Sequence, residues 1–250
     1  MTSPYRPFIT IVTVTYNAER EIVRTLMSVA GQTYQQYEHL IIDGASADKT
    51  LEKVSRFNHY GKLRVMSKPD NGIYHGMNRG LKYAHGKYIL FLNAGDTFAD
   101  ENTLQAFANH AGGGVDIIYG DTLIVGAAGK ILRKRHLNAP DVLTVDSFAK
   151  GMLVCHQAFM VNRKIAPRYS KDYQLSADYD WCIRCMKATS PDRCVNLKRN
   201  VIHYLDNGAT EKHKLKSLRE RFAIMRTHYG LFSTILRHIS FIPRALLRHL

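Results

Sequence analysis

The sequence predicts a protein of the α/β class whose first half forms a doubly wound, mostly parallel sheet. Apolar, β-branched runs alternate with segments of helical spacing, the order expected when helices connect parallel strands. Of the 250 residues, 45% are apolar and 22% are charged, which suits a large buried core and excludes a disordered chain. The pattern changes after Asp121, so the second half is expected to be a subregion fused to this sheet.

The strands of the first half follow from short apolar runs that end in polar residues or glycine. Residues 8–15 (FITIVTVT) form the first strand, and Ile22, Leu26 and Val29 then recur at helical spacing. A helix at 73–84 is predicted although Gly76 and Gly80 weaken it. The other predicted elements are, in order, a strand at 37–43, a helix at 48–57, strands at 63–66 and 88–93, a helix near 101–111 and a strand at 116–119.

The second half continues with shorter elements. We expect a hairpin of 123–125 and 131–134, a strand at 155–161, a helix at 178–187 and a strand within 194–204. The chain therefore divides into one domain over residues 1–210, with halves at about 8–122 and 123–210, and a tail over 211–250.

The tail is basic and amphipathic. It holds nine of the 35 Lys and Arg residues but only two acids, so it carries +7 of the formal net charge of +14. Leu215, Leu218, Phe222, Met225 and Tyr229 form one helical stripe. Two interpretations stay open: a helix that lies on an anionic membrane surface, or a helix packed on the domain with its basic face in water.

Several function classes are disfavoured. Residues 44–50 lack the second glycine of a phosphate-binding loop, no G-x-G-x-x-G follows the first strand, and no G-x-S-x-G is present. No RNA-reading aromatic motif or helix-turn-helix pattern accompanies the charge, so a nucleic-acid partner is not expected. Residues 1–6 lack the apolar core of a signal peptide and no apolar run approaches 20 residues, which favours a cytoplasmic protein.

Polar side chains follow three of the predicted strands. Thr15, Tyr16 and Asn17 follow the first, Asp43 the second, and residues 93–96 (NAGD) the fourth. Because ligands bind beyond the carboxyl ends of parallel strands, these residues are expected along one rim. Buried carboxylates need a partner, and a divalent cation such as Mg²⁺ or Mn²⁺ prefers oxygen ligands.

Four sequence blocks carry a family resemblance. They are residues 13–17 (TVTYN), 40–50 (LIIDGASADKT), 69–80 (PDNGIYHGMNRG) and 88–96 (YILFLNAGD). In order and spacing they resemble family 2 glycosyltransferases, and the bacterial exopolysaccharide branch of the colanic-acid biosynthesis type is the most similar. Residues 155–157 (CHQ) and 177–181 (ADYDW) extend the match. The resemblance implies the GT-A fold, with a Rossmann-like nucleotide-binding half and an acceptor-side subregion.

The resemblance also implies the activity. An inverting enzyme of this kind moves a sugar from a UDP- or GDP-linked donor to a hydroxyl of a glycan acceptor, expected here to be lipid-linked at the inner face of the cytoplasmic membrane. The implied donor-binding residues are Thr15, Tyr16, Asn17, Asp43, Asp70, Asn93 and Asp96. Asp96 matches the last acid of the family's D-x-D metal motif, which has only one Asp here, and His203 is a second candidate metal ligand.

The general base implied by the resemblance is Asp178. It matches the acid of the family's Glu-Asp pair, although Ala177 replaces the first member. Asp180 and Trp181 are candidate acceptor-side residues together with His156. The single acid in the metal motif keeps open a non-catalytic GT-A-like scaffold at the membrane, and the net charge keeps open a basic nucleic-acid-binding protein.

Overall fold

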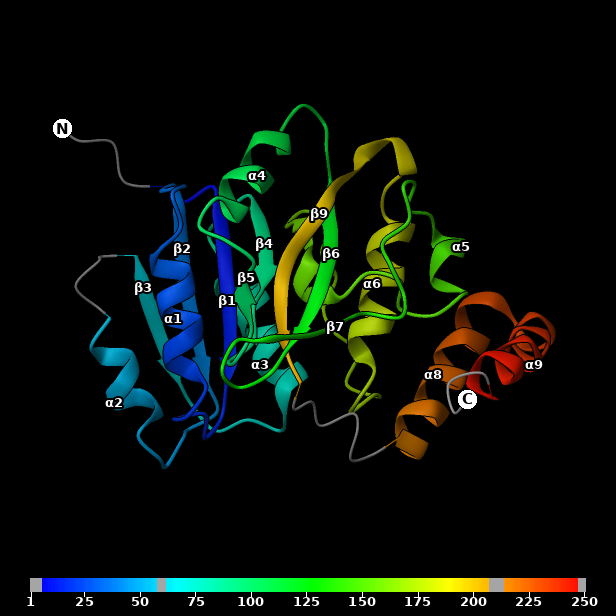
Figure 1. Cartoon of the computed structure of the whole chain (residues 1–250), viewed down its shortest axis with the longest axis horizontal. Helices are drawn as coiled ribbons and strands as arrows, with labels where there is room; N and C mark the ends of the chain where they lie inside the picture. The colour runs from blue at the N-terminus through cyan, green and yellow to red at the C-terminus, as the bar shows by residue number, and fades with distance from the viewer. Residues whose placement is uncertain (1–5, 58–61, 207–213, 247–250) are drawn as a thin grey trace.

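The computed structural model describes residues 6–57, 62–206 and 214–246. Its core is a nine-stranded sheet with the order β3-β2-β1-β4-β8-β6-β9-β5, and β7 pairs with β6 at one side (Figure 1). The strands are β1 (Ile9–Thr15), β2 (Tyr37–Asp43), β3 (Leu63–Ser67), β4 (Tyr88–Phe91), β5 (Thr97–Phe98), β6 (Ile117–Val125), β7 (Ile131–Lys134), β8 (Phe159–Asn162) and β9 (Cys194–Leu205).

Helices connect and cover these strands. They are α1 (Ile22–Ala30), α2 (Thr50–Ser55), α3 (Ile73–Tyr83), α4 (Thr103–His110), α5 (Val145–Phe148), α6 (Ala177–Lys187), α8 (Lys214–Tyr229) and α9 (Leu231–Leu246), with 3₁₀ turns at His156–Ala158 and Pro191–Arg193. In Figure 1, α1 lies in front of β1 and β2, while α8 and α9 lie at the far side beyond α6.

The α/β prediction is confirmed, and the first half is parallel as expected. Strands β3, β2, β1 and β4 are parallel neighbours, whereas β8 runs antiparallel to both β4 and β6. One predicted boundary is wrong: the strand expected at 155–161 begins only at Phe159, because a 3₁₀ turn occupies His156–Ala158.

The two glycines of α3 have a structural role. A Cβ atom would lie 2.6 Å from Val14 Cγ1 at Gly76 and 2.5 Å from Val12 Cγ1 at Gly80, closer than real contacts of this kind. The helix can therefore lie directly on β1, and the glycines that lower its intrinsic propensity are required by its packing. This close approach carries the first turn of α3 to the rim of the sheet.

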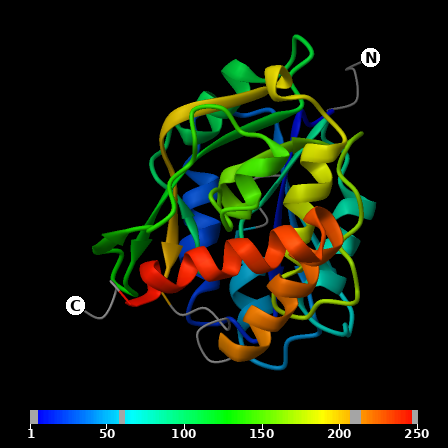
Figure 2. The ribbon, with the colours of Figure 1, turned by 90° about the vertical axis from the view of Figure 1, so that its right-hand side faces the viewer.

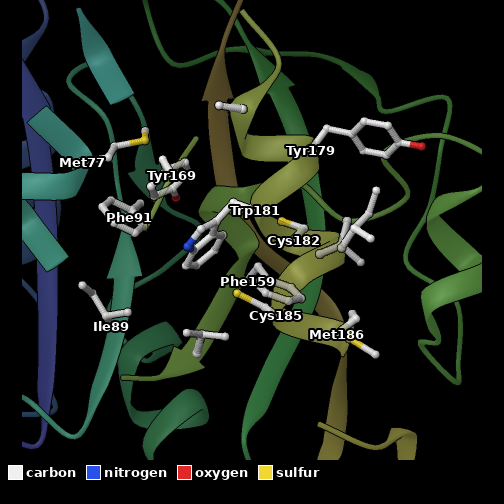
Figure 3. Packing of buried hydrophobic residues seen from close by; sticks show 14 of the residues in the cluster. Met77, Ile89, Phe91, Phe159, Tyr169, Tyr179, Trp181, Cys182, Cys185 and Met186 are labelled. Atoms are coloured by element: carbon white, nitrogen blue, oxygen red, sulfur yellow. The ribbon is translucent and has the colours of Figure 1, made fainter. Parts of the chain in front are cut away.

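The core on the same side of the sheet as α3 is centred on Trp181 of α6. Its ring stacks on Tyr169 at 4.9 Å and meets the edges of Phe91 and Phe159 at 5.7 and 5.9 Å (Figure 3). Cys182 and Cys185 on the same helix are free, buried thiols, so their CxxC spacing serves packing. Such aromatic clusters fix α6, and thereby the side chains at its start, against the sheet.

Helix α8 packs on the domain. For this helix the structure therefore supports the interpretation of a packed helix over that of a helix on a membrane surface. Ile224 and Met225 are buried, and His228 Nε2 lies 2.8 Å from Asp180 Oδ1 on α6. Leu215 and Leu218 of the predicted stripe are exposed instead. Glu220 accepts hydrogen bonds of 2.9–3.0 Å from the backbone N–H groups of residues 174–176, directly before α6.

Helix α9 follows α8 after Gly230 and crosses it (Figure 2). Unlike α8, it leaves large apolar side chains in solvent: Leu231, Phe232, Ile235, Leu236 and Ile239 are all exposed. No helix in the described part of the chain is long and apolar enough to cross a membrane.

Replacing Glu220 with alanine should lower the free energy of unfolding by about 2 kcal/mol, because three backbone N–H groups lose a charged acceptor. Urea unfolding measures the difference. The control is Glu52→Ala, which removes an exposed i,i+4 ion pair with Arg56 and should cost no more than about 0.5 kcal/mol. Equal losses in the two variants would show that Glu220 does not hold the loop.

Candidate active site

The ends of β1 and β2 form one wall of the rim. Asp43 is fully buried and accepts hydrogen bonds from Ser46 N, Ser46 Oγ and Ser67 Oγ at 2.5–3.0 Å. Ser46 Oγ in turn accepts from the backbone N–H of Asn17 at 2.9 Å. Asn17 and Ala45 both have positive φ angles, so this loop pair holds a strained turn of the kind that clusters at binding sites.

Asp70 lies beside the same wall. Its carboxylate is 2.9 Å from Arg79 Nη2, and a Cβ atom on Gly44 would lie 3.2 Å from both Asp70 and the ring of Tyr16. Asp43, Asp70 and Tyr16 are therefore close neighbours, as expected from the resemblance. The side chain of Asp43 stands behind the surface, however, where it holds the loop.

Asp96 occupies the turn after β4. Its Oδ1 accepts from the backbone N–H of Leu205 and its Oδ2 from Gln157 Nε2, each at 2.9 Å. Burial raises the pKa of Asp96 to about 6, although these hydrogen bonds and the nearby side chains of His156 and Arg24 act in the opposite direction. The carboxylate is thus costly to ionise without a positive partner.

Asn93 lies beside Asp96 and has an unused oxygen. Its Oδ1 is buried without a hydrogen-bond partner among the described residues, while its Nδ2 lies 3.4 Å from His156 Nε2. An orphaned amide oxygen beside a carboxylate of raised pKa is a pair of oxygen donors that suits a hard divalent cation. No cluster of three His, Cys, Asp or Glu side chains that could hold a metal ion occurs among the described residues.

Asp178 is held from two sides in the first turn of α6. The Tyr74 hydroxyl donates to its Oδ1 at 3.1 Å, and His156 Nδ1 lies 3.2 Å from its Oδ2. Burial alone would raise the pKa of Asp178, but the hydrogen bond and charge of His156 outweigh it, so the pKa lies below the usual value. The group is therefore ionised at neutral pH and can accept a proton.

The 3₁₀ turn His156–Ala158 joins the two carboxylates. His156 contacts Asp178, and the adjacent Gln157 donates to Asp96. The amide oxygen of Gln157 accepts from the Cys155 thiol at 2.6 Å, which fixes the direction of its amide group. One short turn therefore sets the positions of both acids.

Both acids face one cleft of about 540 Å³. Its walls include Tyr16, Asn17, Asn93, Asp96, His156 and Asp178. The structure thus brings together residues from four separate parts of the sequence, beyond the carboxyl ends of the parallel strands. Sequence reasoning did not assign roles to Tyr74 and Gln157, although both lie within the blocks that carry the resemblance.

Six predicted site residues do not line this cleft: Thr15, Asp43 and Asp70 on the donor side, and Trp181, Asp180 and His203. Trp181 is fully buried and its Nε1 donates to the Pro167 carbonyl at 2.7 Å, so the acceptor-side prediction is corrected. Asp180 is buried in a pair of contacts with Arg184 and His228, at 2.7 and 2.8 Å, and is corrected likewise. His203 lies opposite Thr97 in the β5–β9 pair, where the cleft wall is formed by Tyr204 and Leu205 instead.

A polar cleft at the carboxyl ends of parallel strands, lined by the ionised Asp178 and by Asp96 with its raised pKa, is typical of an α/β enzyme of the nucleotide-binding type. The family model described as glycosyl transferase family 2 matches residues 10–168. The chain belongs to this family and is a glycosyltransferase.

Two relatives cover most of the chain. A PGL/p-HBAD biosynthesis glycosyltransferase of Mycobacterium bovis is 30% identical over 85% of this chain and 84% of its own length. The Escherichia coli protein WfgD is 23% identical over 87% of this chain and 85% of its own length. Its name describes a UDP-Glc:alpha-D-GlcNAc-diphosphoundecaprenol beta-1,3-glucosyltransferase.

Solved structures share the fold. Residues 1–349 of Staphylococcus aureus TarS in complex with UDP-GlcNAc superpose with a TM-score of 0.73 at 16% identity, over 93% of this chain and 73% of that one. The Pyrobaculum calidifontis mannosyltransferase PcManGT, in complex with GDP-Man and Mn²⁺, gives 0.62 at 16% identity, over 98% and 80%. The GT-A prediction is thereby confirmed.

Proposed function

We propose that this protein is an inverting glycosyltransferase that moves a sugar from a nucleotide-diphosphate donor to a hydroxyl of a lipid-linked glycan, in the synthesis of a bacterial surface polysaccharide or exopolysaccharide. The observation that carries the proposal is that two separate acids, Asp96 and Asp178, line one cleft. A glycosyl transfer with inversion needs one charged site for the leaving group and a separate base for the attacking hydroxyl.

The donor would bind across the first wall of the cleft. Tyr16 and Asn17 offer a ring face and an amide to the nucleoside, while Asp43 and Asp70 hold the loops on which they stand. The donor complexes of TarS and PcManGT, with UDP-GlcNAc and GDP-Man, support this use of the fold. Thr15 is buried directly before these residues and would shape the wall rather than touch the ligand.

A divalent cation fits the second part of the donor site. Asp96 and the free Oδ1 of Asn93 would hold it together with oxygen atoms of the donor diphosphate, and PcManGT with Mn²⁺ supports this assignment. When bound, the cation neutralises charge on the diphosphate. Mg²⁺ and Mn²⁺ both suit such oxygen ligands.

In the same cleft, Asp178 would accept the proton of the acceptor hydroxyl. Tyr74 and His156 each occupy one of its oxygen atoms, so they fix the direction of the carboxylate before the acceptor arrives. The hydroxyl oxygen then attacks the anomeric carbon from the side opposite to the diphosphate, and the configuration inverts.

A binding screen tests this function. Nucleotide-sugars with and without Mn²⁺ should raise the melting temperature of the protein, since a ligand that binds only the native state stabilises it. The expected result is a shift with at least one UDP- or GDP-sugar that is larger in the presence of Mn²⁺. If no nucleotide-sugar shifts the melting temperature, the proposed function is wrong.

Membrane binding would reside in α9. Replacing Phe232, Ile235 and Leu236 with serine should markedly reduce co-sedimentation with phosphatidylglycerol vesicles, because these exposed apolar side chains could enter the interface while the basic tail faces anionic headgroups. The control replaces Ile131 and Leu132, equally exposed on β7, with serine and should leave binding unchanged. Equal vesicle binding by all three proteins would rule out α9 as the membrane contact.

A further inference from the structure

A second cavity of about 650 Å³ adjoins the active-site cleft. Ile73, Tyr74, Gln174 and Leu175 line both cavities, so the two share a wall. Tyr74 carries the hydroxyl that bonds to Asp178, which places the second cavity beside the proposed base, and neither Asn93 nor Asp96 lines it. A molecule whose hydroxyl group reaches Asp178 can therefore extend into this second cavity.

The second cavity has a cationic lining. Lys171 and Lys216 reach it from the loop before α6 and from α8, and no Asp or Glu is among its lining residues. Both lysines are exposed, and the Lys216 ammonium also contacts the Gln174 amide oxygen. Glu220, one turn further along α8, accepts hydrogen bonds from backbone N–H groups, and its charge also acts on Tyr74 and Tyr173 of the lining.

His75 adds a donor to this lining. Its Nδ1 lies 3.2 Å from the backbone N–H of Asn71 and accepts from it, so the ring proton of the neutral side chain resides on Nε2. The ring of Tyr173 and the aliphatic side chains of Ile73 and Leu175 complete the lining. Two ammonium groups and an imidazole N–H beside an apolar wall are suited to a phosphate group attached to an apolar chain.

We propose that this cavity, which we call the lysine groove, binds the phosphate or diphosphate that links the acceptor sugar to its lipid. The assignment rests on the proposed function and names the acceptor as a glycosyl phosphate or diphosphate. The sugar hydroxyl lies at Asp178, the phosphate lies between Lys171 and Lys216, and the first part of the lipid follows Ile73 and Leu175. The lysine groove is distinct from the site for the donor diphosphate at Asn93 and Asp96.

Farnesyl diphosphate is a soluble probe of this proposal. Titration calorimetry should show that it binds the full chain, and the double variant Lys171→Glu/Lys216→Glu should weaken this binding at least about tenfold, because two attractive charges become repulsive. Inorganic pyrophosphate should bind more weakly than farnesyl diphosphate, and farnesol should not bind. The matched control is Lys130→Glu/Lys150→Glu, which reverses two exposed charges elsewhere and should bind the probe as the parent protein does.

Three results would overturn the lysine groove. The double variant could bind farnesyl diphosphate like the control, farnesol could bind as tightly as its diphosphate, or the double variant could lose only its affinity for phosphatidylglycerol vesicles, which would assign the lysines to bilayer headgroups. UDP-sugar binding is measured on the same proteins and should not change. If the parent protein binds a nucleotide-sugar but does not bind farnesyl diphosphate, the lysine groove is rejected and the proposed function still stands.

Discussion

The variant Asp178→Asn should lower kcat by about 10²–10⁴-fold, the usual contribution of a general base. Asparagine keeps the size of the side chain and can still accept from the Tyr74 hydroxyl, but it cannot take the proton of the acceptor. Its affinity for the nucleotide-sugar should be nearly unchanged, since Asp178 is not part of the Asn93–Asp96 turn that is proposed to hold the donor diphosphate. Initial rates and donor titrations on one preparation measure both quantities.

The control for this variant is Asp141→Asn, which changes an exposed acid paired only with the exposed Lys198. It should retain full activity. Near-normal sugar transfer by Asp178→Asn would show that another group removes the proton, and a parallel loss of donor affinity would show that Asp178 acts in binding rather than as the base.

The variant Asp96→Asn should lower kcat/KM for the donor by about 10²–10³-fold and remove the extra thermal stabilisation that Mn²⁺ gives with the nucleotide-sugar. The neutral amide is a poorer cation ligand than the carboxylate. It also cannot accept from both the Leu205 N–H and Gln157, because one of its two positions is a donor. Mn²⁺-dependent stabilisation equal to that of the parent protein would exclude Asp96 as a cation ligand.

The pH dependence of the parent protein provides a second measurement of Asp96. Its pKa is raised to about 6, so the carboxylate is protonated below that pH and a proton competes with the cation. We therefore expect kcat/KM for the donor to fall below pH 6, by up to about tenfold per pH unit. The pKa of Asp178 is lowered, so protonation of the base cannot produce a decline at pH 6.

The same shift has a defined effect on stability. Between the ordinary pKa of an aspartate and about 6, the folded protein binds the proton of Asp96 more tightly than the unfolded chain does. The contribution of Asp96 to the free energy of unfolding therefore falls as the pH rises through this window, and it stays low above pH 6. A bound cation should restore it, so stabilisation by Mn²⁺ with nucleotide-sugar should be larger at pH 8 than at pH 5.5.

Much of the donor wall could be predicted from the sequence, because strand ends carry their own local signals. Each of these signals lies within a short stretch of chain: the β-branched run of β1, the end of β2 at Asp43, and the turn at 93–96. The rule that carboxyl ends of parallel strands share an edge then brings them together without further information. The burial of Asp43 was not predicted. Its carboxylate accepts a hydrogen bond from Ser67 on a different strand, and this contact has no signal in the sequence around Asp43.

The acceptor side was harder to predict because it depends on contacts between distant segments. Helix α6 is buried around most of its circumference, and only Asp178, Arg184 and Lys187 escape burial. Helical spacing directs Asp178 and Asp180 to different sides of the helix, but it does not identify the side that faces the cleft. The roles of Tyr74 and Gln157 arise from neighbours 104 and 61 residues away in the chain. The sequence of residues 155–161 predicted one continuous strand and gave no sign of the 3₁₀ turn at His156–Ala158, which contacts both acids.

The face of α8 that meets the domain could not be identified by hydropathy. Ser217 is buried against Ser176 through a hydrogen bond, whereas Leu215 and Leu218 are in solvent. Polar complementarity with a loop 41 residues earlier decides the orientation of this helix. The apolar stripe seen in the sequence therefore matches the buried side at Met225 and Tyr229 but not in the first turn, where Leu215 and Leu218 are exposed.

The contact of α3 with β1 implies a rule about substitutions in related chains. Gly80 and Val12 compete for the same space, as do Gly76 and Val14, so a methyl group gained at either glycine would require a smaller residue at the facing strand position. Pairs of this kind should vary together among homologues while the cleft keeps its width. A lone alanine at position 76 or 80 would lift the helix that carries Tyr74 and so misalign a group that no local motif connects to it.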